Sequence, residues 1–134
     1  YSNTKIIAQG GEKISIGRNT SIQEHSHLEG NIEIDANCVI ASRVYISTTT
    51  HTFNIKEGML IKDQDSIKIP SAKKIIIGSN CWLGISAIIL GQVIVKKNSV
   101  LGSGTLLSNY EAVKDSAIVH NSREVIETEI IYKT

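Results

Sequence analysis

One histidine and one glutamate of this chain have the residue types and the spacing of a proton-transfer pair. His51 follows the run VYISTTT and opens a long stretch without periodicity. A neutral imidazole accepts a proton near pH 7, because its unperturbed pKa is about 6.5. Glu33 precedes His51 by 18 residues, so in a chain that coils every 18 residues it would accept the second ring N–H and fix the tautomer. On the residues alone, a histidine in a threonine-rich corner is more often simply solvated.

In the chain that must position these residues, an aliphatic residue recurs at every sixth position. Within each period the fourth residue after the aliphatic one is mostly small or apolar, so each hexad supplies two inward positions on one short strand. Such a period fits neither an amphipathic helix nor an unbroken two-residue alternation. Aliphatic residues mark twelve hexads: Ile16, Ile22, Leu28, Ile34, Ile40, Ile46, Ile77, Leu83, Ile89, Val95, Leu101 and Leu107.

Three hexads close one triangular coil of a parallel β-helix, and successive coils stack roughly 4.8 Å apart. The period therefore predicts an all-β triangular prism, although it does not show the handedness. The third residue after many of the aliphatic positions is Asn or Gly, the residues that tolerate positive φ. We therefore interpret those residues (Asn19, Asn31, Asn37, Asn80, Asn98 and Gly104) as corner geometry rather than as catalytic groups.

The period is interrupted once and weakens once. Residues from about 51 to 74 have no hexads, which predicts a long loop that projects from one corner toward a ligand or a neighbouring subunit. Beyond Leu107 the pattern fades, which predicts a short C-terminal cap over about 113–134. We expect one domain over residues 1–134.

Composition restricts the possible functions. The formal net charge is +1, and the chain has no nucleic-acid-binding motif, so we expect no nucleic-acid partner. No apolar run approaches the ~20 residues of a membrane span, and no signal peptide is evident, so we expect a cytoplasmic protein. Cys38 and Cys81 occupy small inward positions, which indicates two reduced core thiols. His25 and His27 have no third histidine as a partner, so we expect no metal.

The run from His51 through IIIGSNCWLG, SAIILGQVIV and VLGSGTLLS resembles the hexapeptide-repeat acyltransferases, the left-handed parallel β-helix family. Within that family it is most similar to the branch that O-acetylates sugars and other small molecules. The resemblance covers about residues 14–126 and implies left-handed coiling, acetyl-coenzyme A as the donor and a homotrimer. Two positions depart from the family pattern: residues 120–123 are HNSR, and Val95 is followed by Lys96.

The resemblance also assigns roles to residues. His51 would be the catalytic base, and Glu33, from its spacing, would orient it. Trp82 points outward on its strand, so it would wall the donor site or pack at a subunit interface, and either role predicts an oligomer. The remaining candidates for donor binding are small corner residues and cations: Gly84, Ser86, Gly102, Ser103, Gly104, Thr105, Lys97 and Arg123.

Several functions stay open at this stage. The first is O-acetylation of a sugar or glycan hydroxyl, for example in the modification of a polysaccharide. The others are N-acetylation of an amino sugar nucleotide, a non-catalytic β-helical scaffold or binding module and, more remotely, a zinc hydratase of the same fold.

Overall fold

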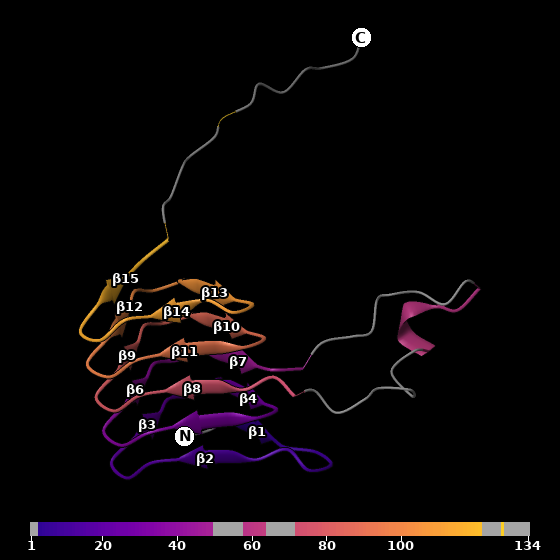
Figure 1. Ribbon diagram of the computed structural model, residues 1–134, viewed down its shortest axis with the longest axis horizontal. Coiled ribbons are helices and arrows are strands. Elements are labelled where there is room, and N and C mark those ends of the chain that lie inside the picture. Colours follow the sequence, from indigo (N-terminus) through magenta and orange to yellow (C-terminus); the bar gives the residue numbers. More distant parts are fainter. Residues whose placement is uncertain (1–2, 50–57, 64–71, 122–126, 128–134) are drawn as a thin grey trace.

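A computed structural model describes residues 3–49, 58–63, 72–121 and 127, and among them it shows a prism of three parallel β-sheets (Figure 1). Each sheet contains five strands, and successive strands of the chain belong to different sheets. Sheet A has the order β1-β4-β7-β10-β13, sheet B the order β14-β11-β8-β5-β2, and sheet C the order β15-β12-β9-β6-β3.

The strands are two or three residues long, as expected when every hexad contains a strand and a corner. Their bounds are β1 Lys5–Ile7, β2 Ile14–Ile16, β3 Ser21–Ile22, β4 His27–Glu29, β5 Ile32–Ile34, β6 Val39–Ile40, β7 Tyr45–Ser47, β8 Ile75–Ile77, β9 Trp82–Leu83, β10 Ile88–Leu90, β11 Val93–Val95, β12 Val100–Leu101, β13 Leu106–Ser108, β14 Ala112–Val113 and β15 Ile118–Val119.

The predicted fold is confirmed: the described chain is an all-β parallel solenoid whose architecture agrees with a left-handed β-helix. Hexad aliphatics stack on one another in the column between the three sheets, and most of them are fully buried. Leu28 pairs with Ile46, for example, and Ile46 with Ile89 in the next coil. Each fully buried aliphatic side chain contributes about 1.5–3 kcal/mol, which makes this column the main source of stability.

The corners are built largely as the sequence predicts. Asn19, Asn37, Asn80 and Asn98 have φ between 55° and 64°, and the Asn80 side chain donates to that of Asn98 across 3.0 Å. Asn31 is the exception. The positive φ at that corner belongs to Gly30 (110°), where a side chain would collide with Thr48, and the Asn31 side chain ties neighbouring segments together instead.

The predicted loop interrupts the coil between β7 and β8 without changing its register. Ile32 of β5 pairs with Ile75 of β8, and Val39 of β6 pairs with Trp82 of β9, so the coil resumes where it stopped. We call residues 5–47 the lower coils and residues 75–119 the upper coils. At the C-terminal end, β14 and β15 continue the solenoid through Val119, and most of the predicted cap lies outside the described residues.

Candidate functional site

The loop leaves and rejoins the coil at the corner between sheets A and B. Ser47 ends β7 on sheet A, and Ile75 begins β8 on sheet B. Both ends of the loop are fixed by Asn31: its backbone N–H donates to the Thr48 hydroxyl (3.0 Å), and its side-chain amide donates to the Lys73 carbonyl (3.3 Å). His51, the predicted base, lies outside the described residues, but its attachment point is therefore well defined.

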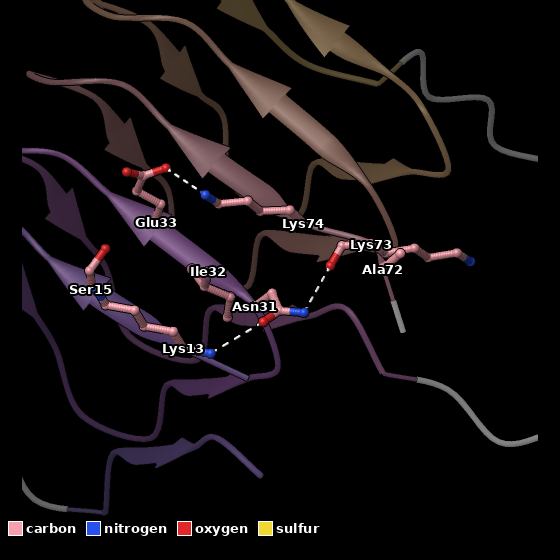
Figure 2. Close-up of a pocket in the computed structure, with 8 residues that line it drawn as sticks. All are labelled: Lys13, Ser15, Asn31, Ile32, Glu33, Ala72, Lys73 and Lys74. Carbon is pink, nitrogen blue, oxygen red and sulfur yellow. Dashed lines mark hydrogen bonds and ion pairs between the residues drawn. The ribbon is translucent and has the colours of Figure 1, made fainter. Parts of the chain in front are cut away.

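Glu33 occupies a different place from the one that its spacing predicts. It lies on β5, and the residue beside it in the next coil is Ile76. In the register of the coil, Ile76 rather than His51 is the residue above Glu33, because the loop is inserted before the coil reaches that position. The orienting role of Glu33 toward His51 stays a prediction, since His51 lies outside the described residues. The Glu33 carboxylate accepts an ion pair from the Lys74 ammonium at 3.0 Å (Figure 2), and both side chains are about half exposed.

A second carboxylate, which the sequence analysis missed, lies nearer to the outgoing end of the loop. Glu29 of β4 accepts a hydrogen bond from the Thr49 hydroxyl at 2.5 Å, and its other oxygen is 3.5 Å from His27 Nε2. The His27 ring stacks on Tyr45, with centroids 4.8 Å apart and planes 6° from parallel. An 18-residue spacing relates His27 to Tyr45, so the same period that located the core could have revealed this cluster.

Trp82 is oriented as predicted. It lies on β9 in sheet C with 53% of its surface exposed. Among the large aromatic side chains of the described residues, only Tyr110 has a larger exposed fraction. Its neighbours on the outer face are Val39 below and Val100 above, and Ile118 follows Val100. The outer face of sheet C therefore carries a continuous apolar row on four of its five strands, β6, β9, β12 and β15.

Two residues predicted to bind the donor are buried. Gly84 is buried, and a Cβ there would stand 2.8 Å from the Leu101 carbonyl oxygen and the Ser103 nitrogen. Glycine is therefore required for the stacking of coils rather than for an open groove. Thr105 is 2% exposed, and its hydroxyl donates to the Val119 carbonyl inside the coil, so its side chain does not reach a ligand on the surface.

The other corner candidates are open to solvent, but on two different corners. Ser86, with φ of 60°, lies below Gly104 at the corner between sheets C and A, and Ser103 is exposed beside them. A Cβ at Gly104 would meet nothing within 4 Å, whereas Gly102 is partly covered by Val119. Lys97 is exposed at the corner between sheets B and C, and Arg123 lies outside the described residues.

The predicted residues therefore gather at three corners of one prism. The loop is attached between sheets A and B, the open small residues lie between sheets C and A, and Lys97 lies between sheets B and C. The whole width of sheet A separates the loop attachment from the open corner. Among the described residues, the structure does not bring these groups together within one copy.

The remaining titratable residues show no metal centre. No group of three or more His, Cys, Asp and Glu side chains converges within the described part of the chain. Cys38 and Cys81 are free, buried and stacked in neighbouring coils, as predicted. The hydrogen bond with Cys81, followed by burial, raises the pKa of the Cys38 thiol. None of the described helical segments has the length and apolar character that a transmembrane helix requires.

Comparisons with known proteins agree with the repeat seen in the structure. Residues 74–109 match the family described as bacterial transferase hexapeptide (six repeats). The bifunctional protein GlmU of Thermodesulfovibrio yellowstonii is 31% identical over a region that covers 81% of this chain. That region is 24% of the relative, so the chain spans only a small part of it.

Three solved structures are similar in fold. A maltose O-acetyltransferase from Clostridium difficile 630 superposes with a TM-score of 0.65 at 23% identity, covering 87% of this chain and 59% of that one. The polySia specific acetyltransferase NeuO gives a TM-score of 0.61 at 30% identity, covering 100% and 62%. A mutant of AntD, an N-acyltransferase from Bacillus cereus, gives 0.59 at 21% identity, covering 87% and 72%.

The repeat and the solenoid point to one class of protein. Residues 74–109 carry the bacterial transferase hexapeptide repeat, and the chain resembles the acetyltransferase NeuO in fold and in sequence.

Proposed function

We propose that this protein is an acetyl-coenzyme A dependent O-acetyltransferase that acts on a hydroxyl group of a sugar or glycan. The observation that carries the proposal is the likeness to NeuO, which extends over the whole chain at 30% identity with a TM-score of 0.61. NeuO is described as an acetyltransferase specific for polySia, and the maltose enzyme shares the same solenoid. The cytoplasmic location inferred from the sequence is part of this proposal.

The chemistry assigned to His51 follows from the reaction. The acceptor oxygen attacks the thioester carbonyl carbon, and the imidazole takes the hydroxyl proton as the C–O bond forms. The tetrahedral intermediate then expels the thiolate of coenzyme A as the C–S bond breaks, and the imidazolium returns the proton to that sulfur. Hydrogen-bond donors must stabilise the oxyanion between the two steps.

The open corner between sheets C and A is the proposed site of the donor. Ser86, Gly102, Ser103 and Gly104 present backbone with little side-chain cover, which suits an extended thiol such as the pantetheine arm. Trp82 would cover the neighbouring face. Lys97, at the far edge of sheet C from this corner, and Arg123 are the candidates for contacting the phosphates. The AntD structure, described as a complex with coenzyme A, supports this class of donor.

A homotrimer would assemble the complete site. Because the attachment points of the loop and the open corner lie at opposite edges of sheet A, we infer that the loop of one copy meets the open corner of another. The apolar row around Trp82 supports this association, since an exposed indole among aliphatic residues gains free energy when it is covered.

His51→Ala tests the proposal. A sugar hydroxyl ionises far above pH 7, so loss of the base should lower kcat by about 10²- to 10⁴-fold, while KM for acetyl-coenzyme A changes little. Free thiol released from acetyl-coenzyme A with a panel of sugars measures the turnover. In wild type kcat/KM should rise through one ionisation near pH 6–7.

His25→Ala is the matched control, because His25 is exposed in the lower coils, two coils below Ser86, whereas His120 lies beside Gly102 in the proposed donor corner. His27 is a poorer control than its sequence position suggests, since it stacks on Tyr45 and contacts Glu29. Full turnover in His51→Ala would show that another residue is the base, and no turnover in wild type with any acceptor would favour a binding module.

N-acyl transfer to an amino sugar nucleotide is the second candidate. AntD is an N-acyltransferase crystallised with dTDP-4-amino-4,6-dideoxyglucose, and it shares this fold. Adding amino sugar nucleotides to the same panel separates the two reactions, because the product is an amide that resists mild alkali, whereas an O-acetyl ester is hydrolysed.

A further inference from the structure

A hollow of about 320 Å³ lies on the outer face of sheet B, directly beside the point where the loop rejoins the coil. Figure 2 shows the side chains that line it on β2, β5 and the segment before β8. Its volume is near the lower end of the range for small-molecule sites. The lining residues are Lys13, Ser15, Asn31, Ile32, Glu33, Ala72, Lys73 and Lys74.

The backbone around the hollow is held in place from three sides. The Ile32 N–H donates to the Lys13 carbonyl (3.0 Å), and the Ile75 N–H donates to the Asn31 carbonyl (3.0 Å). The Asn31 side chain accepts from the Lys13 N–H at 3.2 Å and donates to the Lys73 carbonyl at 3.3 Å. These bonds fix the lower coil and the returning loop relative to each other, so the hollow is preformed.

The polar groups around the hollow suit one residue of an acidic sugar chain. Lys13 and Lys74 lie on either side of Asn31, two strand spacings apart, and supply two ammonium groups against the single carboxylate of Glu33. Figure 2 shows the Lys73 side chain directed away from the hollow, so its ammonium is not part of this set. Sugar hydroxyls need acceptors as well as donors, and Glu33 and Ser15 supply acceptors beside the two cations.

We propose that this hollow is an acceptor subsite that binds a carboxylated sugar residue, with Lys13 and Lys74 contacting the carboxylate and Glu33 accepting from a hydroxyl. Its link to catalysis rests on the proposed function, whereas the binding itself does not. The hollow adjoins Lys73 and Lys74, the point where the loop that carries His51 rejoins the coil, which is the observation that links it to the acceptor. The specificity of the enzyme would then be for acidic glycans.

The test compares two hexasaccharides of matched length, hexagalacturonate and neutral maltohexaose, by calorimetry on the full chain without acetyl-coenzyme A. Hexagalacturonate should bind more tightly, and its affinity should fall as salt rises, because the Debye length shrinks from about 10 Å at 0.1 M to about 3 Å at 1 M. Lys13→Gln and Lys74→Gln should each weaken its binding about three- to tenfold, the size of one charge-assisted contact at a surface.

Two further variants sharpen the result. Lys5→Gln removes the same charge on sheet A and should leave the affinity unchanged. Glu33→Gln removes the only carboxylate of the hollow and should tighten hexagalacturonate binding about twofold or more while weakening no neutral ligand. If Glu33 only stabilised the fold, Glu33→Gln would weaken hexagalacturonate binding or leave it unchanged, and would not tighten it.

The results that would overturn the acidic subsite differ from those that would overturn the proposed acetyltransferase function. Equal affinity for the two hexasaccharides, binding of neither, or equal effects of Lys13→Gln and Lys5→Gln would overturn the acidic subsite. A loss of coenzyme A affinity in Lys13→Gln/Lys74→Gln would overturn it too, by assigning the hollow to the donor phosphates. Tight hexagalacturonate binding without any acetyl transfer would instead contradict the proposed function and leave the subsite standing.

Discussion

The lower coils and the upper coils share one core but differ in their outer faces. Below the loop, outward positions are mostly polar, whereas above it they are aliphatic or aromatic almost throughout. The lower outward residues include Lys5, Ser15, Ser21, His27, Glu29 and Glu33, with Val39 and Tyr45 in the last coil before the loop. The upper ones include Trp82, Ile88, Ile94, Val100, Leu106 and Ile118.

The inner ladder therefore determines the fold, and the outer positions of the two halves can carry different residue types. The inward aliphatic ladder is the same in both halves, so the outer face changes at little cost to stability. The lower coils carry the groups suited to polar recognition, and the upper coils carry the apolar surface suited to association. The loop stands at the boundary between the two.

The largest expected effect concerns the stacking of the upper coils. Gly84→Trp should destabilise the coil by more than about 3 kcal/mol, because even a Cβ would stand 2.8 Å from backbone atoms of the next coil. Ser103→Trp, on the exposed corner nearby, should leave the unfolding temperature close to wild type while blocking the donor. Thermal unfolding followed by circular dichroism compares the two, and equal stability would show that Gly84 is not a packing position.

The next effect concerns the apolar face of the upper coils. Trp82→Lys should weaken self-association by about 2 kcal/mol or more, since buried tryptophans dominate many interfaces. Ser21→Lys adds the same charge to the same sheet in the lower coils and should leave assembly unchanged. Light scattering across a micromolar concentration series measures both, and a monomeric wild type would remove the basis for a shared site.

The sequence predicted the fold well because the hexad period is a local signal that repeats. It located the core, the interruption by the loop and the outward direction of Trp82. It paired Glu33 with the wrong position of the next coil, because an 18-residue rule ignores an insertion. It also offered Gly84 and Thr105 as donor-binding candidates, although Gly84 is packed against the next coil and Thr105 occupies an inward position of its hexad. Lys74 is near Lys13 only because the coil closes after the loop, so no spacing in the sequence could have revealed the hollow on sheet B.

A smaller effect concerns the paired thiols that stack across the boundary between the two halves. Because the pKa of Cys38 is raised in the folded state, the unfolded chain alone loses this proton above about pH 8.5. The raised pKa of Cys38 therefore lowers the stability by up to about 1.4 kcal/mol per pH unit above that pH. The pKa of Cys81, lowered to about 7 by its hydrogen bond with Cys38, adds stability between about pH 7 and 8.5. Cys38→Ala/Cys81→Ala should show a shallower decline in urea unfolding between pH 8.5 and 10, and identical declines would contradict the shift.

In the proposed homotrimer, the loop of one copy and the open corner of another form one acetyl-transfer site. Mixing His51→Ala with Ser103→Trp tests it directly, since each variant alone should be nearly inactive. In randomly mixed trimers about a quarter of the sites join an intact loop to an intact corner, so co-refolded samples should recover about a quarter of wild-type turnover. Recovery at that level would support a shared site, and a mixed sample no more active than its two components would contradict it.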